Sequence, residues 1–332
     1  MRTANVILFC SIFLLTACKD DECSTMLNAV TAFEQVWNDF DQTYAYFELK
    51  DIDWDSLYNA NSSNINEETT FDELESILAQ VTLSLRDLHV RFIGSNKTYQ
   101  FRKRDQFLDN SPENAVNYLS DIIFDNNRVV LGNIQSTNIA YVRIKRLGGM
   151  PADYTEFSTI FQTLPTKDAL ILDVRENGGG NDAVGKAFAE RLTMEERIYE
   201  YVRFRNGTEH HDFNDWTPID ISPSNPVNFD KPIILLTNRG CYSSAESFVL
   251  MIKTLPNVTQ VGDTTGGATG NPKIFSLSNG WKYYISSWQA ATIDFQLIED
   301  HGIAPDVVVN NTEETFNDGR DLILEKAIEL LD

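Results

Sequence analysis

The spacing of apolar side chains predicts a small helical unit early in the chain. Within residues 28–48, apolar residues recur at steps of three and four, the period of an amphipathic helix; they are Val30, Phe33, Val36, Trp37, Phe40, Tyr44 and Phe47. A polar stretch at 59–66 then breaks the pattern. Thr70 and Glu73 have the spacing of a capping box, which predicts a second helix. We therefore expect a helical domain over residues 28–90.

Further along the chain, apolar runs alternate with helical patterns. Five segments have the composition of strands: RVVLGNI, IAYVRIKRL, DALILDVR, PIILLTN and GWKYYISSWQAATID. Helices are predicted at 154–163, at 183–192, at 245–255 and over the closing GRDLILEKAIELL. This alternation is typical of an α/β core with buried parallel strands. We expect a connecting, β-containing segment at 91–137 and the α/β core at 138–332.

The first residues have the pattern of an export signal. One Arg precedes an apolar run that is too short to span a bilayer. The following LTAC resembles a bacterial lipobox, which implies removal of residues 1–17, acylation of Cys18 and a tether over 18–27; an ordinary secretory signal is the alternative. The next letters, KDDE, resemble a surface-export tag. We expect an exported lipoprotein of the outer membrane, displayed at the cell surface.

Charge and cysteine content narrow the class of partner. A net charge of −22 argues against binding to nucleic acid, and membrane contact is expected through the lipid anchor only. Cys23 and Cys241 would remain beside the acylated cysteine, and their spacing does not argue for a disulfide. The sequence contains no CxxC or HExxH pattern, so we expect no metal site. It carries no signal for an oligomeric state.

Three turns carry candidate chemistry. DVRENGGGN, residues 173–181, follows a buried strand, and its glycines allow backbone amides to face an anion; a plain tight turn is the alternative. At 238–246 a strand delivers Ser243 and Ser244 to the start of a helix, whose positive end favours an oxyanion. Helix capping alone is the alternative there. The third turn, LRDLHV, places His89 at a helix end.

Together these turns resemble the serine peptidase family of the C-terminal-processing and tricorn proteases. LDVRENGGGN is similar to the family's oxyanion loop. NRGCYSSAESF is similar to its nucleophile turn, in which a Ser is followed three residues later by Glu; this register selects Ser243, with Glu246 as its partner. VGDTTGGATG and HGIAPDVVV match two further segments. The resemblance implies a ClpP/crotonase-like α/β core with a small N-terminal helical unit, and the gap after His89 is too short for a PDZ insert.

The identity of the general base divides the family. The C-terminal-processing branch uses a lysine at the position of Ala268, and alanine cannot act as a base. The tricorn branch uses a histidine in an L-x-D-x-H segment, which selects His89. A histidine suits this task at neutral pH. His301 and Lys273 are the rival bases, whereas His210 and His211 lie in a polar stretch and are expected to be solvated.

The resemblance also implies the remaining roles. Glu299 would hold and polarise the base, directly or through a hydroxyl of Ser244 or a nearby threonine. The amides of Gly179 and Ser244 would form the oxyanion hole, with Gly180 as the alternative to Gly179. Asn177 is a supporting residue of the same loop.

We therefore expect a serine peptidase acting on peptide or protein substrates through an acyl-enzyme, with no cofactor. Two alternatives remain. Retinoid-binding modules of the interphotoreceptor type use this fold to bind apolar ligands, although such a module has no need of Ser243, His89 and Glu299 together. An esterase or amidase could use the same residues.

Overall fold

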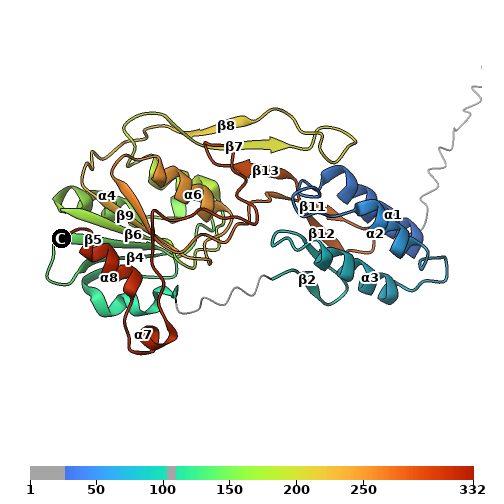
Figure 1. Ribbon diagram of the computed structural model, residues 1–332, viewed down its shortest axis with the longest axis horizontal. Coiled ribbons are helices and arrows are strands. Elements are labelled where there is room, and N and C mark those ends of the chain that lie inside the picture. The colour runs from blue at the N-terminus through green and yellow to red at the C-terminus, as the bar shows by residue number, and fades with distance from the viewer. Residues whose placement is uncertain (1–26, 103–109) are drawn as a thin grey trace, which may run out of the picture.

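The computed structural model describes residues 27–102 and 110–332, which form two bodies with separate hydrophobic cores (Figure 1). In the N-terminal body three helices pack on a four-stranded antiparallel sheet of order β11-β12-β1-β2. The helices are α1 (Ala29–Thr43), α2 (Trp54–Ser62) and α3 (Phe71–Ser84). The strands are β1 (Arg91–Ile93), β2 (Thr98–Gln100), β11 (Pro272–Ser276) and β12 (Lys282–Ser286).

Aromatic packing joins the distant segments of this N-terminal body. Trp37 of α1 stacks on Trp54 of α2 at a centroid distance of 3.8 Å. Trp281, just before β12, meets Phe92 of β1 edge-on at 5.3 Å. Each large side chain buried in this way contributes about 1.5–3 kcal/mol. The helical domain expected at 28–90 therefore also includes β1, β2 and the β11–β12 hairpin from much later in the chain.

The second body is the α/β core. Its seven-stranded sheet has the order β14-β10-β9-β6-β5-β4-β3, parallel from β14 to β5 and antiparallel at β4 and β3. The strands are β3 (Leu119–Asp125), β4 (Val129–Ile134), β5 (Ile139–Ile144), β6 (Ala169–Asp173), β9 (Ile233–Thr237), β10 (Val258–Gly262) and β14 (Val307–Val308). The α/β class is confirmed. The predicted connecting segment 91–137 is wrong, because β3 and β4 belong to this sheet and β1 and β2 to the other body.

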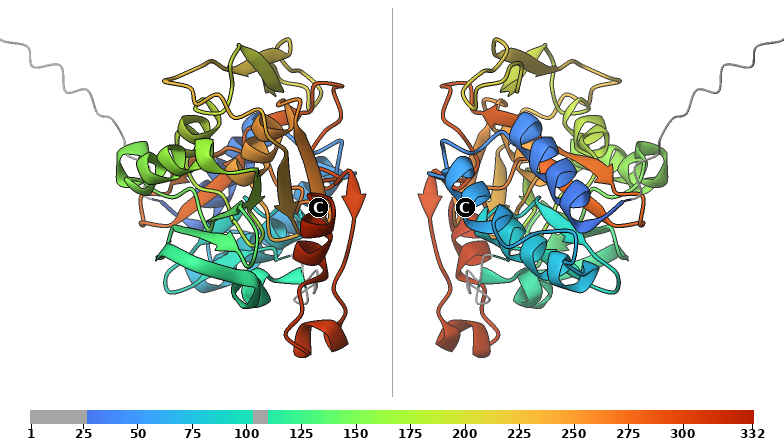
Figure 2. Two further views of the ribbon diagram at one scale, coloured as in Figure 1. Left: turned by 90° about the vertical axis from the view of Figure 1, so that its left-hand side faces the viewer. Right: turned by 90° about the vertical axis from the view of Figure 1, so that its right-hand side faces the viewer.

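Helices cover both faces of the seven-stranded sheet, as the two turned views show (Figure 2). One face carries α4 (Glu156–Thr163), α5 (Asp182–Ala189) and α6 (Ser244–Lys253). The other carries α8 (Leu322–Glu329) and the 3₁₀ helix η2 (Pro112–Tyr118). Short helices η3 (Pro151–Asp153), η4 (Leu164–Thr166) and α7 (Glu313–Asn317) complete the connections.

A small sheet of order β13-β7-β8 connects the two bodies (Figure 1). Its strands are β7 (Arg197–Phe204), β8 (Thr217–Ile221) and β13 (Trp288–Ala291). GWKYYISSWQAATID therefore forms β12 and β13, in different sheets, and the break falls at Ser287. The Ser287 amide donates to the Gly270 carbonyl at 2.8 Å, so the break lies beside the glycine-rich loop that precedes β11.

Two expectations concern the N-terminus and the cysteines. The signal segment with Cys18, and Cys23, lie outside the described residues. Within the described ranges no helix has the length and apolar character of a membrane span. Cys241 is a free, buried thiol, and it donates to the Val174 carbonyl.

Candidate active site

The backbone of Ser243 has a strained conformation, which the surrounding hydrogen bonds maintain. Strand β9 leads into a turn at whose end Ser243 forms the N-cap of α6, with φ 56° and ψ −131°. A non-glycine residue in such a region costs about 1–3 kcal/mol and persists only where its surroundings fix it. Here the Ser243 amide donates to the Ala268 carbonyl at 2.9 Å and to the Glu246 carboxylate at 3.3 Å. Its neighbour Ser244 is already the first residue of the helix.

Glu246 ties the nucleophile turn to the glycine-rich loop after β10. Its buried carboxylate accepts the Thr265 hydroxyl at 2.5 Å and the amides of Gly267 and Ala268, each at 2.8 Å. Burial raises the pKa of Glu246 to about 7, although these donors oppose the shift. The position that carries lysine in the other branch is thus a buried alanine bonded to both Ser243 and Glu246.

The glycine-rich loop after β6 packs directly under the nucleophile turn. Asn177 holds it there: the side chain donates to the Ile144 carbonyl at 2.9 Å and accepts the Gly179 amide at 2.9 Å. Its own carbonyl accepts the Tyr242 amide at 3.1 Å. A Cβ on Gly179 would lie 2.6 Å from the Tyr242 carbonyl oxygen, so only glycine permits this approach.

The prediction that the Gly179 amide forms the oxyanion hole is wrong, because that amide donates to Asn177. Gly178 and Gly180 instead line the pocket that contains Ser243. The Ser244 hydroxyl donates to the Gly180 carbonyl at 3.1 Å, so it is not a relay to the base.

A buried ion network, which the sequence analysis missed, fixes the start of this loop. The Arg175 guanidinium bonds to Asp173 at 2.6 Å and to Asp321, the N-cap of α8, at 2.8 Å. The Tyr141 hydroxyl also donates to Asp173, at 2.8 Å. Burial acts to raise the pKa of Asp173, but Arg175 lowers it below its ordinary value. Ion pairs through Arg175 therefore fix the end of β6, from which the glycine-rich loop starts, to α8.

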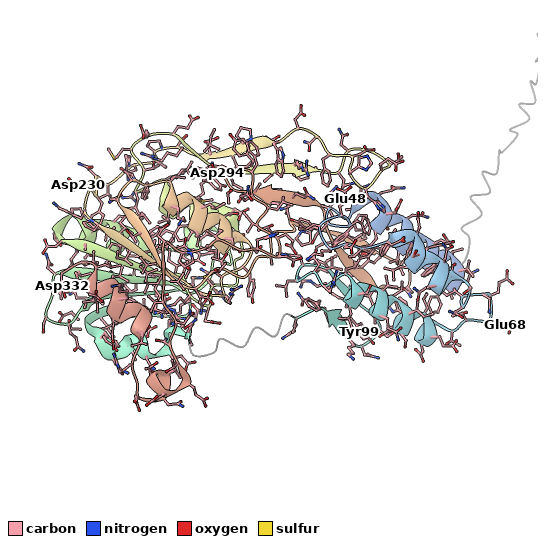
Figure 3. The ribbon with its side chains drawn as sticks, viewed as in Figure 1. Glu48, Glu68, Tyr99, Asp230, Asp294 and Asp332 are labelled. Carbon is pink, nitrogen blue, oxygen red and sulfur yellow. The ribbon has the colours of Figure 1, made fainter. Side chains whose placement is uncertain are left out.

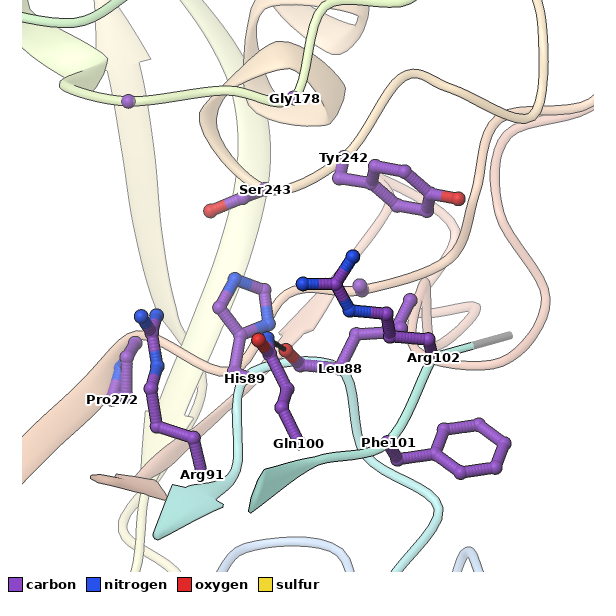
Figure 4. A pocket seen from close by; sticks show the side chains of 12 residues that line it. Leu88, His89, Arg91, Gln100, Phe101, Arg102, Gly178, Tyr242, Ser243 and Pro272 are labelled. Atoms are coloured by element: carbon purple, nitrogen blue, oxygen red, sulfur yellow. Dashed lines mark hydrogen bonds between the residues drawn. The ribbon is translucent and has the colours of Figure 1, made fainter. Parts of the chain in front are cut away.

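His89 reaches the same pocket from the other body (Figure 4). It follows α3 in a turn fixed by buried Asp87, which accepts the amides of His89 at 2.7 Å and Val90 at 3.3 Å. The ring Nδ1 accepts the Gly270 amide at 3.3 Å, and Figure 4 shows the opposite edge of the ring facing Ser243. The structure therefore brings His89, the predicted base, and Ser243, the predicted nucleophile, to the same pocket.

The surroundings of His89 favour its neutral form. Burial lowers the pKa of His89 below its ordinary value. Asp87 opposes this shift, whereas the cations Arg91 and Lys50 add to it. A neutral imidazole is the form that can accept a proton.

Glu299 contacts the backbone beside His89. Its buried carboxylate bonds to the Lys50 ammonium at 2.9 Å and accepts the Thr269 amide at 2.9 Å. The next amide, that of Gly270, is the donor to His89. The predicted link from Glu299 to the base, direct or through a hydroxyl, is replaced by this backbone link. Burial and nearby Asp87 raise the pKa of Glu299 to about 8, and Lys50 opposes the shift.

Neither rival base lines the pocket that contains Ser243. Exposed His301 has its Nδ1 2.9 Å from the Glu299 carbonyl oxygen. Lys273 is exposed on β11. His211 is exposed as expected, whereas His210 is only partly exposed, and its Nε2 lies 2.8 Å from the Asp41 carboxylate.

Two pockets adjoin Ser243. The larger, of about 600 Å³, lies between the bodies and is lined by Leu88, His89, Arg91, Gln100, Phe101, Arg102, Gly178, Gly180, Tyr242, Ser243, Ala268 and Pro272. The smaller, of about 130 Å³, has Asp182, Ser247, Trp288 and Ala290 in its walls. A peptide chain passing Ser243 would have room for a side chain on each side.

A strained serine at a helix N-terminus, with a histidine opposite in the same pocket, is the arrangement of a serine hydrolase. The model of peptidase family S41 matches residues 138–309, and the chain belongs to this family. The resemblance inferred from the three turns is thus confirmed at the level of the family.

Individual relatives agree with this assignment. The chain is 30% identical to the tricorn protease of Thermoplasma volcanium over 58% of its own length and 17% of the relative's. It is 26% identical to the carboxyl-terminal-processing protease of Synechocystis over 52% of its length and 38% of the relative's. The chain therefore spans well under half of these curated relatives.

Solved structures cover nearly the whole chain. A crystal structure described as a candidate peptidase from Parabacteroides merdae is 31% identical, with a TM-score of 0.82 over 92% of this chain and 97% of that one. Mature CPAF bound to lactacystin shares the fold at 14% identity, with a TM-score of 0.69 over 92% and 98% of the two chains.

Proposed function

We propose that this chain hydrolyses peptide bonds through an acyl-enzyme on Ser243, with His89 as the general base. One observation carries the proposal: Ser243, held in a strained backbone conformation, and His89, delivered from the other body, line a single pocket. A serine hydroxyl is a weak nucleophile until an adjacent base removes its proton.

The reaction begins when the His89 ring nitrogen facing Ser243 takes the hydroxyl proton and Oγ attacks the scissile carbonyl. His89 then donates that proton to the leaving amine, and water attacks the acyl-enzyme by the reverse proton path. This role requires the ring proton on Nδ1, whereas the 3.3 Å contact with the Gly270 amide uses Nδ1 as an acceptor. We therefore propose that this hydrogen bond is absent from the reactive tautomer.

We assign the oxyanion hole to the amides of Gly180 and Ser244. Gly180 is exposed and lines the pocket, and the hydrogen bonds to the Leu147 backbone are made by its neighbours, the Gly179 carbonyl and the Asn181 amide. Ser244 is the first residue of α6, where helix amides lack intrahelical partners and the dipole favours negative charge. Donors fixed in this way stabilise the charge that develops in the transition state.

Glu299 and Lys50 act as positioning residues in this scheme. Their 2.9 Å ion pair joins the core to the N-terminal body just beside the loop that contacts His89. It therefore sets where the base stands relative to the nucleophile.

The pocket argues against the alternative of a binding module for an apolar ligand. Two arginines, a histidine and a glutamine contribute to its lining, and desolvating them against an apolar ligand is costly. An esterase or amidase would use the same residues, so the leaving group has to be tested directly.

A peptide-library digest tests the proposal. The purified chain should cleave a set of peptides, and the Ser243→Ala variant, prepared identically, should not. Products identified by mass spectrometry then give the cleaved bonds. Hydrolysis of simple esters without cleavage of any peptide would replace the peptidase assignment with the esterase alternative.

We also propose that Cys18 carries lipid and anchors the chain to the outer membrane, facing the cell surface. The LTAC pattern and the acidic letters after it support this. Cys18→Ala should abolish incorporation of labelled acyl chains and release the protein from the membrane fraction. Acylation that persists in this variant would refute the proposed anchor.

A further inference from the structure

The pocket beside Ser243 has a charge opposite to that of the whole chain. The sequence contains 49 acidic and 27 basic residues, and acidic side chains such as Glu48, Glu68 and Asp230 extend from the periphery (Figure 3). The lining of the larger pocket nevertheless includes Arg91 and Arg102, and no carboxylate from the described residues. A cationic recess in an acidic protein concentrates anions from solution.

Arg91 lies over an aromatic ring of the neighbouring strand. It lies on β1 opposite Tyr284 of β12, and its guanidinium stacks on that ring at 4.4 Å from the centroid. Among the described residues no carboxylate forms an ion pair with Arg91, and its buried Nε has no hydrogen-bond partner. A planar, stacked guanidinium is suited to bidentate contact with a carboxylate.

Arg102 faces the same space from the segment after β2. Figure 4 shows its guanidinium directed toward Ser243 and Tyr242, with Arg91 on the other side of His89. Among the described residues no acidic group pairs with Arg102 either. The two cations therefore flank the path that a substrate takes to the nucleophile.

The smaller pocket has the opposite character. Asp182 contributes to its walls, so an anionic group would be repelled there. A substrate carboxylate is consequently directed to the larger pocket, on the His89 side of Ser243.

We propose that Arg91 and Arg102 bind a carboxylate of the peptide substrate next to the scissile bond, and so select substrates that carry one. The carboxylate belongs either to an acidic side chain or to a free C-terminus. The proposal rests on the proposed peptidase function, and it adds the chemical class of the substrate.

Four quenched peptides of one parent sequence test this. One pair differs by Glu against Gln near the cleaved bond, both amidated; the other pair has a free or an amidated C-terminus. We expect the carboxylate member of at least one pair to have a kcat/KM about tenfold higher, the order expected for a hydrogen bond to a charged group. The pair that shows the preference identifies the source of the carboxylate.

Variants assign the preference to the two arginines. In the double variant Arg91→Gln/Arg102→Gln the ratio should fall to about one, and in wild type it should fall with added salt. Lys273→Gln removes one positive charge from nearby β11, outside the pocket lining, and should keep the wild-type ratio. A wild-type ratio near one for both pairs, or a preference that survives in the double variant, would overturn the proposal.

Binding separates this proposal from the peptidase assignment. If the wild-type chain cleaves no peptide, the proposed function fails, but fluorescence anisotropy with Ser243→Ala still measures affinity for the same four peptides. About tenfold tighter binding of a carboxylate peptide, lost on adding the two arginine substitutions, supports the carboxylate site. Equal affinities for both members of each pair reject it.

Discussion

The α/β core and the N-terminal body hold the two proposed catalytic residues in different ways. Ser243 is fixed by partners within the core, namely the Ala268 carbonyl and the Glu246 carboxylate. His89 is oriented by Asp87 from its own body but also by the Gly270 amide from the core. The nucleophile is therefore pre-organised locally, whereas the position of the base depends on how the two bodies pack.

The largest loss of activity should come from replacing Ser243, whose partners all lie within the core. Ser243→Ala should lower kcat/KM by about 10³-fold or more, as for triad members of other serine enzymes. Ser244→Ala loses a hydroxyl bond to the Gly180 carbonyl but keeps its amide, so its loss should be much smaller. Steady-state hydrolysis of one peptide by both variants measures the difference; an inactive Ser244→Ala enzyme beside an active Ser243→Ala enzyme would move the nucleophile by one residue.

Replacing His89, the residue that the N-terminal body contributes, should lower the activity nearly as much. His89→Ala should lose about 10³-fold in kcat/KM, because no other base lines the pocket within the described residues. Lys273→Ala and His301→Ala should retain most of the activity. If Lys273→Ala were inactive and His89→Ala active, the Ser-Lys mechanism would be restored and the comparison between the bodies would lose its basis.

The contact between the bodies can be broken at a single lysine, because Lys50 pairs with both Glu299 and Asp300 at 2.9 Å. At a pH above about 8, the pKa of Glu299, Lys50→Met leaves the buried carboxylate without its cation, and removing one partner of a buried pair costs about 3–5 kcal/mol. Chemical denaturation should show this loss in the free energy of unfolding, and adding Glu299→Gln should recover part of it. Lys326→Met breaks the exposed pair with Glu329 on α8 and should cost less than about 1 kcal/mol. Equal, small effects of the two lysine variants would argue that Lys50 does not hold the bodies together.

The smallest effect is a shift in pH dependence. Because the base must be neutral, kcat/KM should rise with pH through the pKa of His89, and burial places that midpoint below about 6.5, the ordinary value. Arg91→Gln removes a cation that lowers the pKa of His89, so the midpoint should move upward. A midpoint above the ordinary value, unmoved by this substitution, would contradict the assigned base.

The sequence predicted the buried strands of the α/β core better than it predicted the N-terminal body, which combines distant segments of the chain. Strands β6 and β9 are buried at every position, so their unbroken apolar runs identified them. The β11–β12 hairpin joins a helical body that lies far earlier in the chain, and such a contact leaves no trace in local periodicity. The exposed and mixed patterns of β7 and β8 likewise gave no period to detect.

In the site, motifs identified the residues that sit on local turns: Ser243, Glu246 and His89. Asp87 had a signal, because it is the acidic member of the same LRDLHV segment. Lys50 and Arg91 had none, since their roles arise only where distant segments meet. The Gly179 prediction failed because the reach of the Asn177 side chain depends on the conformation of the turn.

Covalent labelling with a fluorophosphonate tests the central claim most directly, because the probe reacts only with an activated serine. Peptide mapping by mass spectrometry should place one adduct per wild-type chain on Ser243. His89→Ala should label far more slowly, and Lys273→Ala should label at the wild-type rate. An adduct on another serine, or equal labelling of wild type and His89→Ala, would contradict the account of a core nucleophile activated by a base from the N-terminal body.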